Sequence, residues 1–194
     1  MLFDFGEFTM RIHFLMFGTY YINSSKDKPV RLYLEFNDGS YVNFYSTAHK
    51  LLEGTPEEVY DWKTDVLSEE WDEKTVVKKI KERPDRPVCD VLLDQDVFTG
   101  VGNIIKNEVL FLTKIHPLTQ IGDLPPKKRK ELIKTAVSYT YDFLEWKREG
   151  TLRSHWQAHR QKICPRDHIP FHKDYLGENK RQSFWCEECQ KRYE

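Results

Sequence analysis

The sequence predicts an α+β fold with a β-sheet at its start, helices through its middle and a metal-binding hairpin at its end. Up to about residue 52, short runs of aromatic and branched residues alternate with turn residues. Longer segments with capping residues and apolar stripes follow. Residues 164–189 then hold three of the four cysteines, which indicates a small metal-stabilised element.

The composition suits a globular chain with a real core. Of its 194 residues, 31% are charged and 39% hydrophobic. No apolar run approaches the ~18 residues of a membrane span, so we expect no membrane association. The start carries Asp4 and Glu7 where an export signal has Lys or Arg. We therefore expect an intracellular protein of the cytoplasm or nucleoid, with cysteines that bind metal or are free thiols.

The net charge of the whole chain is close to zero, but its C-terminal segment is basic. Residues 147–194 hold eleven Lys and Arg against seven Asp and Glu, although the whole chain has a net charge of −1. A basic segment on a neutral chain favours an anionic partner, with nucleic acid as the first candidate. A solvated surface is the alternative that charge alone leaves open.

Residues 1–54 are predicted to form part of a β-sandwich. The runs 11–21, 31–36 and 41–45 read as strands, and Asn37-Asp38-Gly39-Ser40 reads as the turn between the last two. The chain begins inside an apolar, strand-like run. We therefore expect the leading part of the sandwich to be absent.

Three further segments are predicted to follow. Residues 55–87 form a helical connector, with helix starts at Thr55-Pro56-Glu57-Glu58 and near Asp72. Residues 88–160 form a helical domain, with helices over 88–98, over 104–113 and from Pro125-Pro126 onward. Residues 161–194 form the metal-binding end.

The cysteine spacing predicts a structural zinc site. Cys186 and Cys189, two residues apart, can hold one ion from a single turn, and Cys164 begins the other half. Asp167 stands at the usual partner position, but the imidazole of His168 suits zinc better. We therefore predict Cys164, His168, Cys186 and Cys189 as ligands, with His172 as the alternative fourth ligand. Three ordinary buried thiols beside a surface His are the other interpretation, and Cys89 is expected to be a buried structural thiol.

A second signal lies between two predicted helices. Gly100 and Gly102 permit a tight turn, and Asn103 then begins the next helix. Free backbone N–H groups and a side-chain amide at a helix start favour binding of a phosphate. Spacing alone also fits a plain helical hairpin.

The residues themselves resemble a known family. The stretch LLDQDVFTGVGNIIKNEVLFLTKIHP, residues 92–117, resembles the helix–two-turn–helix (H2TH) signature of the formamidopyrimidine/endonuclease VIII (Fpg/Nei) DNA glycosylases. KRQSFWCEECQ, residues 180–190, resembles the end of that family's zinc finger, with Arg181 five residues before Cys186 and Gln190 after Cys189. The likeness extends over the whole chain, and a Cys-His-Cys-Cys ligand set looks like one vertebrate endonuclease VIII-like branch.

The resemblance implies roles for particular residues. Asn103 matches the turn Asn that contacts DNA phosphate, and Arg181 matches the finger Arg that grips phosphates beside the damaged nucleotide and takes part in lyase chemistry. Met16 falls on the Met that fills the gap left by a flipped base. Apart from the resemblance, Lys106, near the helix start, is expected to contact phosphate or to lie on a solvated face. The implied partner is double-stranded DNA with damaged bases or abasic sites, bound by a monomer.

The chain also departs from the family. The family's catalytic amine belongs to an N-terminal Pro followed by Glu, whereas this chain begins Met1-Leu2-Phe3-Asp4. Cys89 replaces a Lys that often precedes the LLDQ motif, which favours oxidised pyrimidines over 8-oxoguanine. We expect a base-excision glycosylase and abasic-site lyase whose catalytic amine is missing from this chain. A non-catalytic binder of damaged DNA is the alternative, followed by a zinc-stabilised structural module.

Overall fold

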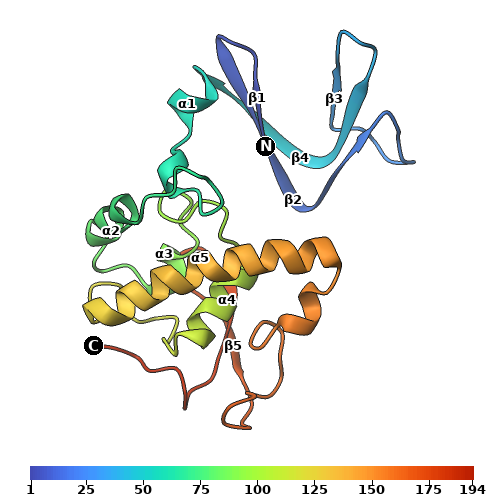
Figure 1. Ribbon diagram of the computed structural model, residues 1–194. Helices are drawn as coiled ribbons and strands as arrows, with labels where there is room; N and C mark the ends of the chain where they lie inside the picture. The colour runs from blue at the N-terminus through green and yellow to red at the C-terminus, as the bar shows by residue number, and fades with distance from the viewer. The chain divides into compact units, whose positions relative to one another are not determined.

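The protein is described by a computed structural model covering residues 1–194, apart from the side chain of Met16. The chain divides into two compact units, here called the sheet unit (residues 1–61) and the helical unit (residues 62–194) (Figure 1). The predicted connector is divided between them. The predicted helical domain and the cysteine-rich end both belong to the helical unit.

The sheet unit is one antiparallel sheet with strand order β1-β2-β4-β3. Its strands are β1 (Leu2–Asp4), β2 (Phe8–Ile22), β3 (Leu32–Glu35) and β4 (Tyr41–Glu53). The helix α1 (Pro56–Val59) follows, where Glu58 accepts a hydrogen bond from the Thr55 N–H at 2.9 Å. The predicted α+β class and partial sandwich are confirmed, and β4 is longer than its predicted strand.

A tight turn and an apolar face stabilise this sheet. Gly39 has a φ of 81°, which the turn between β3 and β4 requires, and the Phe36 N–H bonds the Ser40 carbonyl at 2.8 Å. Ile12, Val42 and Phe44 are buried on one face of the sheet. Alternate residues of β2 and β4 therefore supply the small core of the unit.

The pairing of β2 with β4 is interrupted in the middle. Its register shifts between Phe14 and Thr19. A Cβ on Gly18 would lie 2.9 Å from the Ser46 carbonyl oxygen, so the close approach of the two strands requires glycine there. Met16 falls in this stretch, and its predicted wedge role concerns a side chain outside the described part of the structure.

The helical unit is built around two α-helices that pack against each other, α4 and α5. Its elements, in chain order, are η1 (Trp62–Thr64), α2 (Glu73–Lys81), α3 (Val88–Val91), α4 (Asn103–Leu112), α5 (Pro126–Glu149), η2 (Leu152–His155), β5 (His172–Leu176) and β6 (Arg181–Trp185). The strands β5 and β6 form an antiparallel hairpin, and β6 packs against α4 (Figure 1).

Capping residues fix the helix ends of this unit. Asp72 caps α2 by accepting hydrogen bonds from the N–H groups of Lys74 and Thr75. Gly150, with a φ of 75°, ends α5 in a left-handed conformation. The expected helix over 88–98 was wrong beyond Val91.

The side chain of Asp94 explains that early end. It accepts the N–H of Asp96 at 3.0 Å and binds the guanidinium groups of Arg83 and Arg86 at 3.2 and 2.7 Å. An Asp side chain that accepts a hydrogen bond from a backbone N–H two residues further along the chain favours a turn over a continued helix.

The core of the helical unit is large and continuous. Leu92, Phe98, Val109, Leu110 and Leu132 are all at or below 1% exposure within it. Its burial of apolar surface stabilises the arrangement of α4 against α5. No helix in the described part of the chain is long and apolar enough to span a membrane.

Candidate functional site

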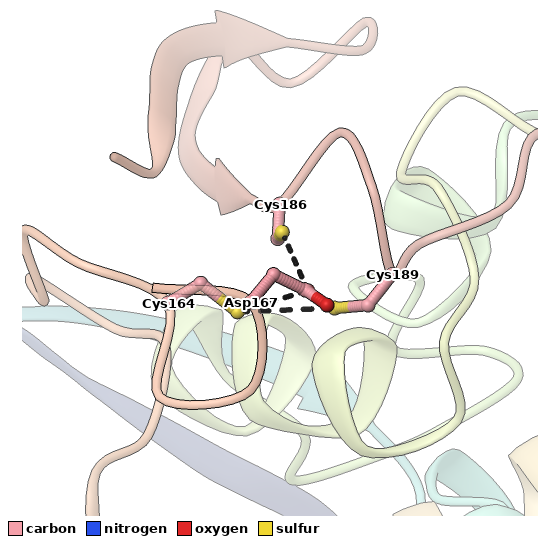
Figure 2. A group of neighbouring side chains, drawn as sticks. All are labelled: Cys164, Asp167, Cys186 and Cys189. Carbon is pink, nitrogen blue, oxygen red and sulfur yellow. Dashed lines mark hydrogen bonds between the residues drawn. The ribbon is translucent and has the colours of Figure 1, made fainter. Parts of the chain in front are cut away.

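Three thiols and one carboxylate converge beyond the base of the β5–β6 hairpin. The sulfur atoms of Cys164, Cys186 and Cys189 and a carboxylate oxygen of Asp167 all lie within 4.8 Å of one another (Figure 2). The Asp167 carboxylate lies 3.1 Å from the Cys186 sulfur and 3.4 Å from the Cys164 sulfur. The group joins the loop before β5 to the turn after β6.

Backbone hydrogen bonds shape both halves of this group. The His168 N–H bonds the Cys164 carbonyl at 2.9 Å, which closes the first turn and leaves His168 with a φ of 58°. The Gln190 N–H bonds the Cys186 carbonyl at 3.1 Å and closes the second turn. Each turn aims its side chains toward the other, as a metal-binding pair of turns does.

The fourth member of the group corrects the prediction. Asp167, and not His168, lies with the three sulfur atoms. His168, the next residue along the chain, is exposed and lies outside this group. The alternative, His172, is engaged elsewhere: its Nε2 lies 2.8 Å from Glu187, and its ring stacks on Trp185 at 5.3 Å.

The donor set fits a zinc ion. Three sulfur donors and one oxygen donor at this mutual spacing match a tetrahedral site. Cys164 and Cys186 are fully buried, and burial raises the pKa of the Cys186 thiol. The Arg166 guanidinium also lies 3.8 Å from the Cys189 sulfur. A bound cation would stabilise the thiolate forms that zinc requires.

The Gly100–Gly102 turn presents the start of α4. Gly100 has a φ of 92°, and its N–H bonds the side-chain oxygen of Gln95 at 3.1 Å. Gly102 is the N-cap of α4 and offers no side-chain cap. The first N–H groups of a helix have no partner within the helix, so this start attracts anions. The structural role of Gln95 was not predicted, although the sequence contains it in the LLDQ motif.

Asn103 and Arg181 are neighbours in space. The side-chain Nδ2 of Asn103 donates to the carbonyl of Gln182 at 3.0 Å, although the two residues are 79 positions apart. Arg181 is exposed, and its guanidinium has no hydrogen bond or ion pair within the described part of the chain. The predicted amide thus bonds the backbone next to Arg181, while the Asn103 Oδ1 is buried.

Lys106 lies elsewhere than predicted. Its side chain is 0% exposed, so it offers no surface contact to phosphate. Its Nζ donates to Ser183 Oγ at 2.7 Å and to the Gln182 carbonyl at 3.2 Å. Lys106 lies one turn beyond Asn103 on the face of α4 that packs against β6, and that packing encloses it.

Asn107 completes the contact between α4 and β6, a role that the sequence analysis did not predict. Its Nδ2 donates to the Gln182 carbonyl and its Oδ1 accepts the Phe184 N–H, both at 3.2 Å. A side-chain amide that bonds both groups replaces the neighbouring strand that β6 lacks on this side. The strand carrying Arg181 is therefore held to the helix carrying Asn103.

A buried carboxylate holds the turn of the hairpin. Asp90 is 1% exposed and accepts the Glu178 N–H at 2.9 Å and the Asn179 N–H at 3.4 Å. Arg86 adds an ion pair to Glu178 at 3.2 Å. Cys89, beside Asp90, is a buried thiol as expected, and burial raises its pKa to about 12.

Comparisons with known proteins agree with this geometry. Residues 63–153 match the family model described as "Formamidopyrimidine-DNA glycosylase H2TH domain". Endonuclease 8-like 2 of Mus musculus is 30% identical over 195 residues, which cover 93% of this chain and 57% of that protein. Endonuclease 8-like 3 of Bos taurus is 32% identical over 200 residues, which cover 96% of this chain and 32% of that protein.

Solved structures share the fold. A viral DNA glycosylase has a TM-score of 0.79 at 19% identity, covering 97% of this chain and 84% of the other. The Lactococcus lactis formamidopyrimidine DNA glycosylase, non-covalently bound to DNA with an abasic site, has a TM-score of 0.78 at 20% identity, covering 96% and 75%.

The fold and the site together define an H2TH protein with a cysteine-rich C-terminal hairpin. These matches support membership of the chain in the Fpg/Nei family of DNA glycosylases, as the resemblance predicted. It spans 57% of the length of the mouse endonuclease 8-like 2 protein.

Proposed function

We propose that this chain recognises damaged double-stranded DNA as part of a base-excision DNA glycosylase and abasic-site lyase. The observation that carries the proposal is the contact between Asn103 and the backbone beside Arg181. It brings a helix start, an amide and an unpaired guanidinium to one surface. Family membership supports DNA as the partner, because the Lactococcus lactis relative was solved on DNA with an abasic site.

The chemistry of this surface suits a DNA phosphate. The free N–H groups at the start of α4 favour an anion, and the guanidinium of Arg181 can donate two parallel hydrogen bonds to phosphate oxygens. The charge of Arg181 is solvent-accessible and unpaired within the described residues, so no internal ion pair must be broken. In this proposal Arg181 also takes the lyase-related role that the family resemblance implies.

Asn103 can leave its internal hydrogen bond at small cost. The Gln182 carbonyl receives three donors, from Asn103, Lys106 and Asn107. A carbonyl oxygen has two lone pairs, so two donors satisfy it. The Oδ1 of Asn103 is buried without a partner among the described residues. Turning the Asn103 amide toward phosphate therefore leaves no backbone group unsatisfied.

The base-flipping part of the proposal involves the sheet unit. Met16 is proposed to fill the space left by a flipped nucleotide, on the strength of the family resemblance.

A binding assay tests the proposal. Fluorescence anisotropy should give tighter binding to a duplex with an abasic site than to an undamaged duplex, with affinity falling as salt rises. Arg181→Ala should weaken binding about 10- to 100-fold, the range of a hydrogen bond to a charged group. Arg148→Ala, an exposed Arg at the far end of α5, is the matched control and should change little. Equal binding to both duplexes would refute the proposal.

Borohydride trapping separates catalysis from binding alone. A covalent adduct with abasic-site DNA requires an amine that attacks the sugar. Binding without an adduct would assign this chain a role in DNA recognition alone. An adduct would mean that another amine of the chain performs the attack.

We also propose that the cluster of three cysteines and one aspartate holds a structural zinc ion. Cys164, Cys186 and Cys189 supply three ligands, and Asp167 supplies the fourth in the arrangement of Figure 2. Cys164→Ser should lose most of the bound zinc measured by mass spectrometry, whereas Cys89→Ser should retain it, because Cys89 lies outside the group.

The pair Asp167→Asn and His168→Asn then identifies the fourth ligand. The distances predict the larger loss of zinc affinity for Asp167→Asn. A larger loss for His168→Asn would mean that zinc binding turns the exposed imidazole inward and displaces the carboxylate.

A further inference from the structure

The buried amine of Lys106 is the least expected group in the helical unit. A lysine is almost never fully buried unless its charge is compensated. Here the side chain is 0% exposed, and its Nζ donates hydrogen bonds to two neutral groups, Ser183 Oγ and the Gln182 carbonyl. Asn107, one residue away, already bonds the same carbonyl, so the amine is not needed merely to satisfy it.

The charges around this amine come from several elements. Asp90, on α3, is a carboxylate engaged by the hairpin turn, and Arg181, on β6, is the exposed guanidinium of the proposed DNA surface. Two other titratable neighbours are neutral near pH 8: burial raises the pKa of Cys89 to about 12 and lowers that of His159 to about 4. Apart from burial, Arg181 lowers the pKa of Lys106, whereas Cys89 and, more weakly, Asp90 raise it.

We propose that Lys106 is a positioning residue for DNA binding, which holds the β6 backbone beside Arg181 and gains a proton when phosphate binds there. The inference rests on the proposed function of the same surface. Lys106 itself touches no DNA; it acts through Gln182, Ser183 and the charge of Arg181.

The protonation state of Lys106 links this internal contact to the outer surface. Burial lowers the pKa of Lys106 to about 8, and the nearby positive charge of Arg181 lowers it further than burial alone would. A phosphate bound to Arg181 brings negative charge and removes that repulsion, so the pKa of Lys106 rises in the complex. Binding then takes up protons at pH values near and above 8, and affinity falls as pH rises through this range.

The linkage between proton uptake and DNA binding sets the expected change of the dissociation constant with pH. If bound DNA raises the pKa of Lys106 by about one unit, the dissociation constant of wild type increases about fivefold between pH 7 and pH 9. Lys106→Met keeps the length of the side chain but cannot titrate, so its dissociation constant should be higher at pH 7 and should lack this fivefold change. Lys130→Gln removes an exposed charge from α5 and is the matched control, with a pH profile like that of wild type.

The experiment compares these three proteins on the abasic-site duplex by anisotropy at both pH values, with circular dichroism to verify folding. Calorimetry of wild type in buffers of different ionisation enthalpy measures proton uptake directly and needs no variant. Proton uptake near pH 8.5 that is absent near pH 6.5 supports the proposal. No uptake by a wild type that binds, or an unchanged pH profile in a folded Lys106→Met, overturns it. A wild type that does not prefer the abasic duplex would instead refute the proposed function.

Discussion

Gly177 and Asp90 form the contact that fixes the hairpin turn at the scale of single residues. Gly177 has a φ of 74°, and a Cβ built on it would collide with both carboxylate oxygens of Asp90. The Asp90 carboxylate must lie this close to Gly177 in order to accept hydrogen bonds from the N–H groups of Glu178 and Asn179. A side chain at 177 would therefore break the contact between α3 and the hairpin.

Gly177→Ala tests this contact. It should lower the free energy of unfolding of the helical unit by about 3 kcal/mol, since backbone strain of about 1–2 kcal/mol adds to the loss of a buried contact. Gly150→Ala is the matched control: its φ is 75° and nothing lies within 4 Å of its Cβ. It should cost only the strain, and equal losses in urea unfolding would contradict the role given to Asp90.

Glu108 is a second buried carboxylate, and its hydrogen bonds to the backbone can be tested by substitution. It is 0% exposed and accepts the N–H groups of Gln157, Ala158 and His159 at 2.9, 3.0 and 2.7 Å. Burial raises its pKa even though these donors oppose that change. The carboxylate thus replaces hydration with three backbone bonds.

Glu108→Gln should destabilise the helical unit by about 2–3 kcal/mol, because an amide NH₂ would then face a backbone N–H. Glu145→Gln, an exposed residue of α5, is the control and should change stability by less than about 0.5 kcal/mol. Chemical denaturation measures both. A loss at Glu108 no larger than at Glu145 would mean that the three bonds contribute nothing net.

At the scale of elements, the β5–β6 hairpin is attached at three places. Asp90 holds its turn, Asn107 and Lys106 hold the middle of β6, and Gln190 holds its base. The Gln190 side chain accepts the Cys186 N–H and donates to the Ile115 carbonyl, both at 2.9 Å. The proposed metal site and the packing against α4 therefore both involve the same hairpin.

Removing the metal separates these contributions. We expect chelation to expose the backbone amides around the cysteine turns to hydrogen exchange, while the amides of α4 and α5 stay protected by the main core. Hydrogen exchange with mass spectrometry on the apo and zinc-loaded chain measures this. Equal exchange at the cysteine turns in both forms would show that zinc is not structural there.

Particular residues show what the sequence could predict of the elements and what required the structure. Local signals were sufficient for the Gly39 turn, the α5 helix from Pro126 and the cysteine grouping, because each depends on neighbouring residues. Asn107 and Asp90 gave no signal, since their partners lie 77 and 88 positions away. Lys106 was assigned to the surface because a lysine near a helix start usually faces solvent.

His168 illustrates a different limit. Ligand chemistry alone favoured imidazole over carboxylate, yet the turn that bonds the His168 N–H to Cys164 directs Asp167 inward. One residue of spacing changes the direction of a side chain, and only backbone geometry determines which of two adjacent residues faces the sulfur atoms. The wedge and phosphate roles of Met16, Asn103 and Arg181 remain predictions until DNA is bound.

At the scale of the whole molecule, the helical unit carries both DNA-contacting groups that the family resemblance implies, while Met16 belongs to the sheet unit. The hydrogen bond from Asn103 on α4 to the Gln182 carbonyl on β6 links the two groups that we propose to contact DNA. Their effects on binding should therefore depend on each other.

A double-mutant cycle on the abasic-site duplex tests this central claim most directly. Asn103→Ala and Arg181→Ala should each weaken binding by about 10- to 100-fold, with Arg181→Ala also lowering the salt slope by about one. The double variant should lose at least about fivefold less than the product of the single losses, because we propose that both groups contact the same phosphate. Independent, multiplicative losses, or single variants that bind like wild type, would contradict the account.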